Sequence, residues 1–325
     1  MKRTRVLSAA LLACCVVAPA SAQDVYPNRI VKVIVGFPPG SAADVTARLI
    51  APRLGDGLGQ AVIVENKAGA SSNIAAEAVV RAPADGYTLM LGSAANAIGA
   101  SLNKQAHFDF ARELVPVAPL TSLPNLLVVH PSLPVHSVQE LIAYAKSEEA
   151  QKQGILYGST GSGTVPHLSG EMFNAMAGVK LVHIPYKGSP PAVTDLLAGR
   201  VQVMFSPAST VLPHIKAGTL RALASTGSKR TPAAPELPTV AESGLPGYET
   251  SIWFGLFAPA ATPREIVERL SREAARATAS PGLKAQFAAQ AIDVMSGTPE
   301  QFGAYVRQEI EKWARLVEAS GARLD

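Results

Sequence analysis

Short apolar runs alternate with segments of helical periodicity along the chain from residue 29 onward. Residues 29–37, 61–67 and 87–94 are rich in Val, Ile and Leu, and each run has the length of a buried strand. Between them, residues 43–54 and 73–82 space their apolar positions as an amphipathic helix does. Such a βαβ alternation is typical of a largely parallel sheet covered by helices, so we expect one α/β lobe to begin here.

A proline-spaced stretch at 115–134 interrupts this rhythm, and a second series of elements follows it. We expect the chain to cross from one lobe to the other near Leu120–Pro124. The elements expected after the crossing are helix 137–149, strand 155–160, helix 164–178, strand 181–186, helix 190–199, strand 201–206, a short helix around 212–217, strand 220–226, a strand within 251–259, and helices from 263 to about 279 and from 300 to about 319.

The C-terminal part has too few strands to build a third lobe, so we expect it to complete the first one. The sequence thus predicts a discontinuous first lobe, residues 23–121 plus 226–325, and a second lobe, residues 122–225. Two inter-lobe crossings, with hinges near 120–124 and 224–227, would leave a ligand cleft between the lobes. We expect a monomer.

The N-terminus has the pattern of a secretory signal peptide. Lys2, Arg3 and Arg5 precede an apolar stretch from Val6 to Ala18, which gives way to the small residues Ala20–Ala22. A charged head, a short apolar centre and small residues before the cut predict a signal peptide at 1–22 and a periplasmic mature protein. The apolar stretch is too short to span a bilayer, although an uncleaved anchor is an alternative.

Both cysteines, Cys14 and Cys15, lie in this segment, so the mature chain has no thiol for a disulfide, a thiolate metal site or nucleophilic catalysis. Leu11–Cys14 loosely resembles a lipobox, but the residues after Cys14 stay apolar, which makes a lipoprotein the less favoured alternative. The formal charge of +4 includes the three signal-peptide cations. The mature chain has no basic run with interleaved aromatic residues, so nucleic acid is not expected as a partner.

Three loops rich in small residues follow the strands predicted for the first lobe. Ligands of open α/β sheets bind at the carboxyl ends of strands, where helix N-termini direct free N–H groups outward. In the first loop we expect Asp44 to cap the following helix. Each loop could also be a ligand-free connection. Three such loops at successive strand ends of one lobe favour ligand binding. The candidate ligand-binding residues in these loops are Phe37, Pro38, Gly40, Ser41, Asp44, Ala70, Ser71, Ser72, Ser93 and Ala94.

The second lobe offers a loop at 157–168 and a turn that begins at Tyr186. Hydroxyls and glycines crowd the loop just before a predicted helix, a composition suited to an anion or polar group. In the turn, Tyr186 could bound the ligand, whereas Lys187 either pairs with an acid or is solvated. His167 and His183 are interpreted as structural. The candidates here are Ser159, Thr160, Gly161, Gly163, Thr164, Tyr186, Lys187 and Gly188.

Six segments together resemble the serial motifs of the Bug family, the receptors of tripartite tricarboxylate transporters. They span most of the mature chain in the expected order and comprise residues 26–50, 66–93, 157–178, 183–205, 212–224 and 245–263. The resemblance implies a type II periplasmic binding protein fold, α/β in class, whose two lobes close on a small organic carboxylate. It also implies delivery of that ligand to membrane permease subunits.

The family's way of binding would place the carboxylate on backbone N–H groups and ordered waters of residues 37–44 and 69–73. The loop at 158–164 and the turn at 186–188 would then set specificity. Two departures from the family pattern are expected to affect the ligand. Gly40-Ser41 and Ser71-Ser72 stand where paired glycines are common, and Ser206, also a candidate ligand contact, stands where many relatives have aspartate.

A periplasmic hydrolase on an α/β scaffold is the alternative function. The chain has no G-x-S-x-G elbow, no His-Glu-x-x-His zinc pattern and no Walker lysine. Ser101–Lys104 fits S-x-x-K, which we interpret as solvated helix surface. Gly161-Ser162-Gly163 begins a dinucleotide fingerprint, but Pro166 replaces its third glycine. We therefore expect a solute-binding receptor without catalytic residues, metal or cofactor.

Overall fold

The computed structural model describes residues 26–102 and 108–320. The predicted signal peptide, with both cysteines, lies outside these residues, as do the last two positions of the Ser101–Lys104 pattern. Among the described helices, none combines the length and the apolar character needed to cross a membrane.

The first lobe begins with the predicted βαβ series. Strands β1 (Val31–Val35), β2 (Val62–Asn66) and β3 (Thr88–Ser93) are parallel, with β1 in the middle. Most of their Val, Ile and Leu side chains pack in the core, because parallel strands are covered on both faces, but Ile63 of the edge strand β2 is exposed. The helical elements that follow them are α1 (Ala42–Leu58), the short 3₁₀ helix η1 (Ala70–Ser72), α2 (Asn73–Val80), α3 (Ala94–Leu102) and α4 (Phe110–Glu113).

The proline-spaced stretch forms one strand of 16 residues, β4 (Leu114–Val129), where we expected only a crossing. It pairs antiparallel with β9 (Ser251–Pro259) as far as Pro124. From Asn125 onward it pairs antiparallel with two strands of the second lobe, β7 (Val203–Pro207) and β8 (Arg221–Ser225). The register against β9 shifts after Pro116 and again after Pro119. Proline has no N–H to donate, and such shifts accommodate it within a ladder.

The second lobe contains the parallel strands β5 (Ile155–Ser159), β6 (Leu181–Pro185) and β7 (Val203–Pro207), while β8 (Arg221–Ser225) pairs with β4. The sheet order across both lobes is β2-β1-β3-β9-β4-β7-β5-β6. The helices of this lobe are α5 (Val138–Ala145), α6 (Glu148–Gln153), α7 (Val165–Ala177), α8 (Ser189–Leu197) and α9 (Ala208–Lys216).

Two predicted helices of the second lobe have different bounds in the structure. The single helix expected at 137–149 is two, because Ser147 accepts a hydrogen bond from the backbone N–H of Ala150 and begins α6. Helix α9 begins at Ala208, four residues before the predicted start, since its first turn lacks a capping side chain that would mark it in the sequence.

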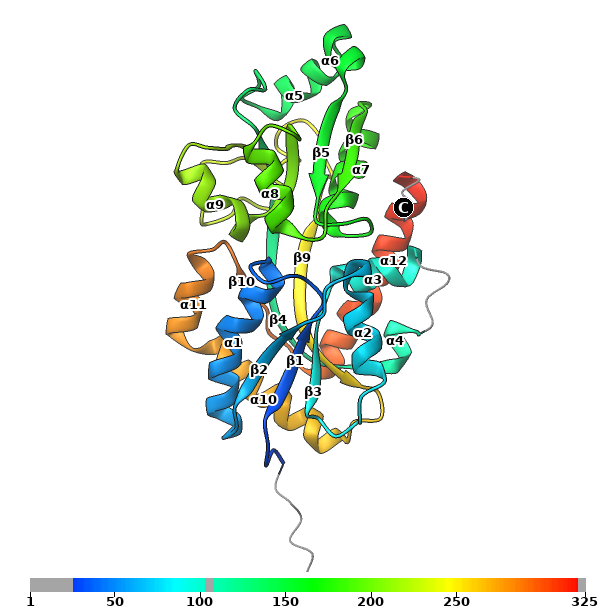
Figure 1. The fold of residues 1–325 in the computed structure, drawn as a ribbon, viewed down its shortest axis with the longest axis vertical. Coiled ribbons are helices and arrows are strands. Elements are labelled where there is room, and N and C mark those ends of the chain that lie inside the picture. The colour runs from blue at the N-terminus through cyan, green and yellow to red at the C-terminus, as the bar shows by residue number, and fades with distance from the viewer. Residues whose placement is uncertain (1–25, 103–107, 321–325) are drawn as a thin grey trace, which may run out of the picture.

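The C-terminal part returns to the first lobe, as Figure 1 shows with β9 and β4 running between the lower first lobe and the upper second lobe. Helices α10 (Arg264–Ala279) and α12 (Pro299–Ser320) agree with the predicted ones. The structure adds α11 (Pro281–Ala288) and the two-residue strand β10 (Asp293–Val294), which are too short and weakly patterned to be predicted.

Each lobe has its own apolar core. Trp253 and Phe257 belong to the core of the first lobe, and Phe173 and Phe205 to a core of the second. Residues 240–248 also pack into that second core through Val240, Leu245 and Tyr248. We therefore propose that the second lobe extends to Thr250, beyond the boundary at 225 that the sequence predicts.

Candidate functional site

Two neighbouring cavities lie between the lobes, at the carboxyl ends of the strands. The first, of about 40 Å³, holds a few water molecules or a group of similar size. The second is larger, about 510 Å³. Phe37 and Thr160 line both cavities, so the two spaces adjoin. Lys187 is the one charged residue among the lining residues of either cavity, and it belongs to the second.

Most of the predicted site residues line one of these cavities. Those on the first are Phe37, Ser41, Ser93, Ala94, Thr160 and Thr164. Those on the second are Phe37, Pro38, Ala70, Ser71, Thr160, Gly161, Gly163, Tyr186, Lys187 and Gly188. The predicted residues that line neither are Gly40, Asp44, Ser72, Ser159 and Ser206. Contact of any of them with a ligand stays a prediction.

The first cavity is surrounded by helix N-termini from both lobes. Its lining includes the cap and first turn of α1 (Ser41–Ala43), the start of α3 (Ala94 and Ala95), the cap and first turn of α7 (Thr164–Pro166) and the first residue of α8, Ser189. The helix dipole gives each N-terminus a partial positive charge. Free backbone N–H groups add to it, except at Pro166 of α7 and at Pro190 and Pro191 of α8, which have no N–H. Four such ends around one small cavity favour an anionic group.

The prediction that Asp44 caps α1 is wrong. The helix begins one residue after Ser41, whose hydroxyl accepts a hydrogen bond from the backbone N–H of Asp44 at 3.3 Å. The Asp44 carboxylate instead accepts from the backbone N–H of Gly40 at 3.0 Å and from Asn66 Nδ2 at 2.9 Å. Asp44 therefore stabilises the loop conformation and lines neither cavity.

Asp44 is only 3% exposed, and its ionisation state follows from its partners. Burial opposes the charged form, but hydrogen bonds from Arg48, the Gly40 N–H and Asn66 outweigh it and hold the pKa of Asp44 below its usual range. The carboxylate is thus ionised at neutral pH and keeps the Gly40 turn in place.

The loop at 69–73 has an unusual backbone. Ala70, Ser71 and Ser72 have φ values of 45°, 51° and 78°, in the left-handed region that non-glycine residues rarely occupy. The Ser72 hydroxyl is buried without a hydrogen-bond partner within the described structure. A Cβ on Gly36 would lie 2.0 Å from that hydroxyl, so only glycine at 36 allows this approach of the two loops.

The hydroxyls of Ser93, at the end of β3, and of Thr160 and Thr164, in the loop at 158–164, are already hydrogen bonded. Ser93 donates to Asn96 Oδ1, which also accepts the Ser93 N–H at 3.0 Å. Thr160 donates to Thr164 Oγ1 at 3.1 Å, and Thr164 donates to the carbonyl oxygen of Gly161 at 2.7 Å. These bonds fix the orientation of the hydroxyls on the wall of the first cavity.

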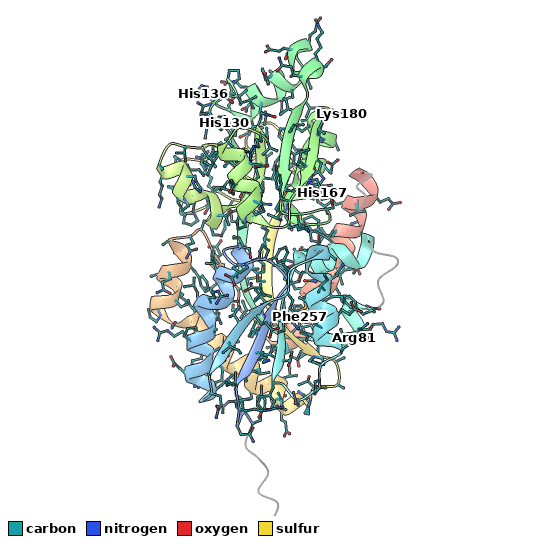
Figure 2. All side chains as sticks on the ribbon, in the orientation of Figure 1. Arg81, His130, His136, His167, Lys180 and Phe257 are labelled. Atoms are coloured by element: carbon teal, nitrogen blue, oxygen red, sulfur yellow. The ribbon has the colours of Figure 1, made fainter. Side chains whose placement is uncertain are left out.

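Two histidines, His167 and His183, contact the loop at 158–164 through hydrogen bonds. Ser159 Oγ accepts the Gly161 N–H at 3.1 Å and lies 2.7 Å from His183 Nε2, while His167 Nδ1 accepts the Gly163 N–H at 3.1 Å. The two imidazole rings stack 4.1 Å apart. Figure 2 shows His167 at the end of the second lobe that faces the first. This arrangement agrees with the structural role predicted for both histidines.

Tyr186 is fixed by residues farther along the chain. Its hydroxyl donates to Asp195 Oδ2 at 2.8 Å, and Arg200 Nη1 lies 2.7 Å from Asp195 Oδ1. Burial and the Asp195 carboxylate raise the pKa of Tyr186 to about 12, so the phenol is neutral at physiological pH. Its neighbour Lys187 is exposed and forms no ion pair with any residue that the structure describes.

Ser206 is buried in β7 and pairs with Thr210 at 2.9 Å, which explains why its hydroxyl does not reach either cavity. Residues that the sequence did not suggest take part instead. Ile252 and Phe254 of β9 line the first cavity, and Trp253 between them points away, its indole N–H donating to Glu309 Oε2 at 3.0 Å. The alternation of a strand was visible in the sequence, but which face met the cleft was not.

Contacts across the cleft show the lobes touching. Ser71 Oγ donates to the carbonyl oxygen of Ser162. A Cβ on Gly188 would lie 2.5 Å from Pro38 Cγ, so these two loops also meet closely. Within the described residues, no group of three or more His, Cys, Asp and Glu side chains could hold a metal ion.

Two α/β lobes, joined by long strands around a cleft walled by helix N-termini, define the class of two-lobed binding proteins. A sequence model described as tripartite tricarboxylate transporter family receptor matches residues 46–322, and the chain belongs to this family. The protein BugT of Bordetella pertussis is 40% identical over 311 residues, which cover 95% of this chain and 94% of that protein.

Solved structures agree with this membership. The R. palustris protein Rpa4515, solved with adipate, superposes with a TM-score of 0.87 at 37% identity, covering 92% of this chain and 100% of that one. MatC from Rhodopseudomonas palustris, solved with bound malate, gives a TM-score of 0.84 at 30% identity over 90% of this chain and 100% of that one. Both the predicted family and the predicted fold class, a type II periplasmic binding protein with two lobes, are thus confirmed.

Proposed function

We propose that this protein is a periplasmic receptor that captures a small organic carboxylate in the inter-lobe cleft and delivers it to the membrane permease subunits of a tripartite tricarboxylate transporter. The observation that carries the proposal is the ring of four helix N-termini around the first cavity, drawn from both lobes. An acid held there contacts α1 and α3 on one side and α7 and α8 on the other, so it stabilises the closed arrangement.

The character of the site suits reversible binding. The first cavity has no charged lining residue. Its neutral donors include backbone N–H groups and the Ser41 hydroxyl, whereas Ser93 and Thr164 already donate their hydroxyl protons to protein acceptors. Neutral donors and helix ends bind a carboxylate without the strength of a buried ion pair. The relatives solved with adipate and malate support a carboxylate as the ligand class.

Two further observations support the proposed export to the periplasm and the proposed delivery to permease subunits. The segment at 1–22 has the sequence of a cleavable signal peptide, which would carry the mature chain to the periplasm. Family membership supports delivery to membrane permease subunits, because the family is described as the receptor of a tripartite transporter.

We also propose that the protein has no enzymatic activity. Two serine hydroxyls lie 2.7 Å from an imidazole nitrogen in the described residues: Ser132 beside His130, outside both cavities, and Ser159 beside His183. Ser159 is fully buried, lines neither cavity, and its oxygen already accepts the Gly161 N–H. A hydrolytic serine must reach its substrate, and this one does not.

Thermal unfolding of residues 23–325 with a panel of malate, adipate, amino acids and aromatic acids tests the function. We expect at least one acid to raise the melting temperature in a concentration-dependent way, because a ligand that binds only the folded state stabilises it. Stabilisation by no acid, together with turnover of an ester or phosphate substrate, would contradict the proposal and favour the hydrolase alternative.

A further inference from the structure

Asp195 lies outside both cavities, yet it holds a residue that lines one of them. It lies in the last turn of α8, and its two carboxylate oxygens are shared between Tyr186 at 2.8 Å and Arg200 at 2.7 Å. The side chain of Asp195 is 25% exposed and that of Arg200 is 69% exposed, so the ion pair lies on the outer side of the turn. The phenol of Tyr186 points to this pair, which orients its ring.

Tyr186 lines the second cavity from the side of the second lobe. A Cβ on Gly158 would lie 3.5 Å from the Tyr186 ring, so the ring packs directly on β5. The N–H of Tyr186 donates to the carbonyl oxygen of Ser159 and that of Gly188 to the carbonyl oxygen of Thr160, both at 3.2 Å. The turn that starts at Tyr186 is therefore joined to the loop that lines both cavities.

The same turn leads into α8, whose first residue lines the first cavity. Ser189 is 3% exposed, and Gly188 meets Pro38 of the opposite lobe. The bond from Tyr186 to Asp195 thus ties the start of the turn to the helix that follows it. Loss of this tie would free the wall that closes on the ligand.

We propose that Asp195 is a positioning residue for the cleft, which sets ligand affinity by holding Tyr186 and the turn at 186–189 in place. This proposal rests on the function proposed above. The direction of the change in affinity separates this proposal from simple electrostatics. Removal of a negative charge near the cleft would strengthen binding of an anion, whereas release of the turn weakens binding.

The experiment compares Asp195→Ala, Asp195→Asn, Tyr186→Phe and the double variant Tyr186→Phe/Asp195→Ala by calorimetric titration with adipate and malate. Asp195→Ala and Tyr186→Phe should each weaken binding about tenfold, and the double variant no more than either one, because both remove the same bond. Asp195→Asn keeps an oxygen to accept the phenol and should stay within about threefold of the wild type. Glu268→Ala, which breaks the 2.7 Å pair with Arg264 on α10, is the matched control and should leave affinity unchanged.

Hydrogen exchange of the unliganded protein gives a second readout that needs no ligand. The amides of Tyr186 and Gly188 are hydrogen bonded, so the peptide covering 181–190 should take up deuterium faster in Asp195→Ala than in the wild type and in Glu268→Ala. Unchanged exchange in that peptide, additive losses of affinity in the double variant, or an Asp195→Ala affinity within twofold of the wild type would each overturn the proposal. If neither acid binds the wild type, the proposed function fails for these acids, and the exchange result alone decides the role of Asp195.

Discussion

The Ser71 hydroxyl donates a hydrogen bond to the carbonyl oxygen of Ser162, which joins a loop of the first lobe to a loop of the second across the cleft. Ser71 has a φ of 51°, a conformation that costs a non-glycine residue about 1–2 kcal/mol. A strained residue therefore contributes one of the contacts that hold the lobes together.

Removal of this hydroxyl should speed ligand release. A single hydrogen bond of this kind contributes about 0.5–1.5 kcal/mol, so Ser71→Ala should raise the dissociation rate roughly twofold to tenfold in stopped-flow measurements. Ser71→Gly also lacks the hydroxyl but relieves the strain. It should release the ligand as fast as Ser71→Ala does and melt at a higher temperature. Equal melting temperatures of the two variants, or release at the wild-type rate, would contradict this account of Ser71.

Asp44 should make stability depend on pH in the acid range. Its pKa is lower in the folded protein than the ordinary value of 3.8, so its contribution to the free energy of unfolding is fully present above that value. The contribution is lost as the pH falls through the folded pKa. Asp44→Asn should thus be less stable than the wild type at pH 7, by about 1–3 kcal/mol in urea unfolding, and the difference should shrink below about pH 4. A difference that stays constant down to pH 3 would show that the carboxylate charge contributes nothing.

Gly36 is predicted to tolerate no side chain. The Cβ of an alanine there would lie 2.6 Å from the Ser72 backbone, so Gly36→Ala must displace the loop at 69–73 and should lower both stability and ligand affinity. Gly282→Ala is the matched control, since its Cβ would meet nothing within 4 Å and the helix α11 gains up to about 1 kcal/mol. Chemical unfolding measures the stability of the two variants, and calorimetry measures their ligand affinity. Wild-type affinity in a folded Gly36→Ala protein would exclude a role for this close approach.

Glu309 should be important for stability because both tryptophans depend on it. Its Oε2 accepts the indole N–H of Trp253 at 3.0 Å and that of Trp313 at 2.9 Å. Glu309→Ala leaves two buried donors unpaired and should cost about 2–5 kcal/mol in urea unfolding, whereas Glu309→Gln keeps an acceptor and should cost less. Equal losses in the two variants would mean that the indole bonds contribute little.

The order of helices and strands could be predicted from the sequence because apolar periodicity records which faces are buried. The strand ends that carry the cleft loops followed from the same pattern, and residues such as Ser41 and Thr164 do line a cavity. The role of Asp44 could not be predicted in the same way. It depends on Asn66, a partner that only the folded chain brings near.

Other features of the site depend on contacts that have no local signature. Ser159 and Ser206 look like their neighbours in the sequence, but His183 and Thr210 engage their hydroxyls away from the cavities. The proline-spaced stretch predicted only a lobe crossing because proline disfavours a strand interior, yet register shifts accommodate two of its prolines within β4. Long-range packing decided each of these cases.

The crystal structure of mature protein with the acid that stabilises it most tests the central claim most directly. The account predicts a carboxylate in the first cavity, within hydrogen-bond distance of donors at the N-termini of α1 or α3, with the remainder of the ligand directed toward Thr160 and the second cavity. An acid bound outside the cleft, or bound in it without contact to any helix N-terminus, would contradict the account.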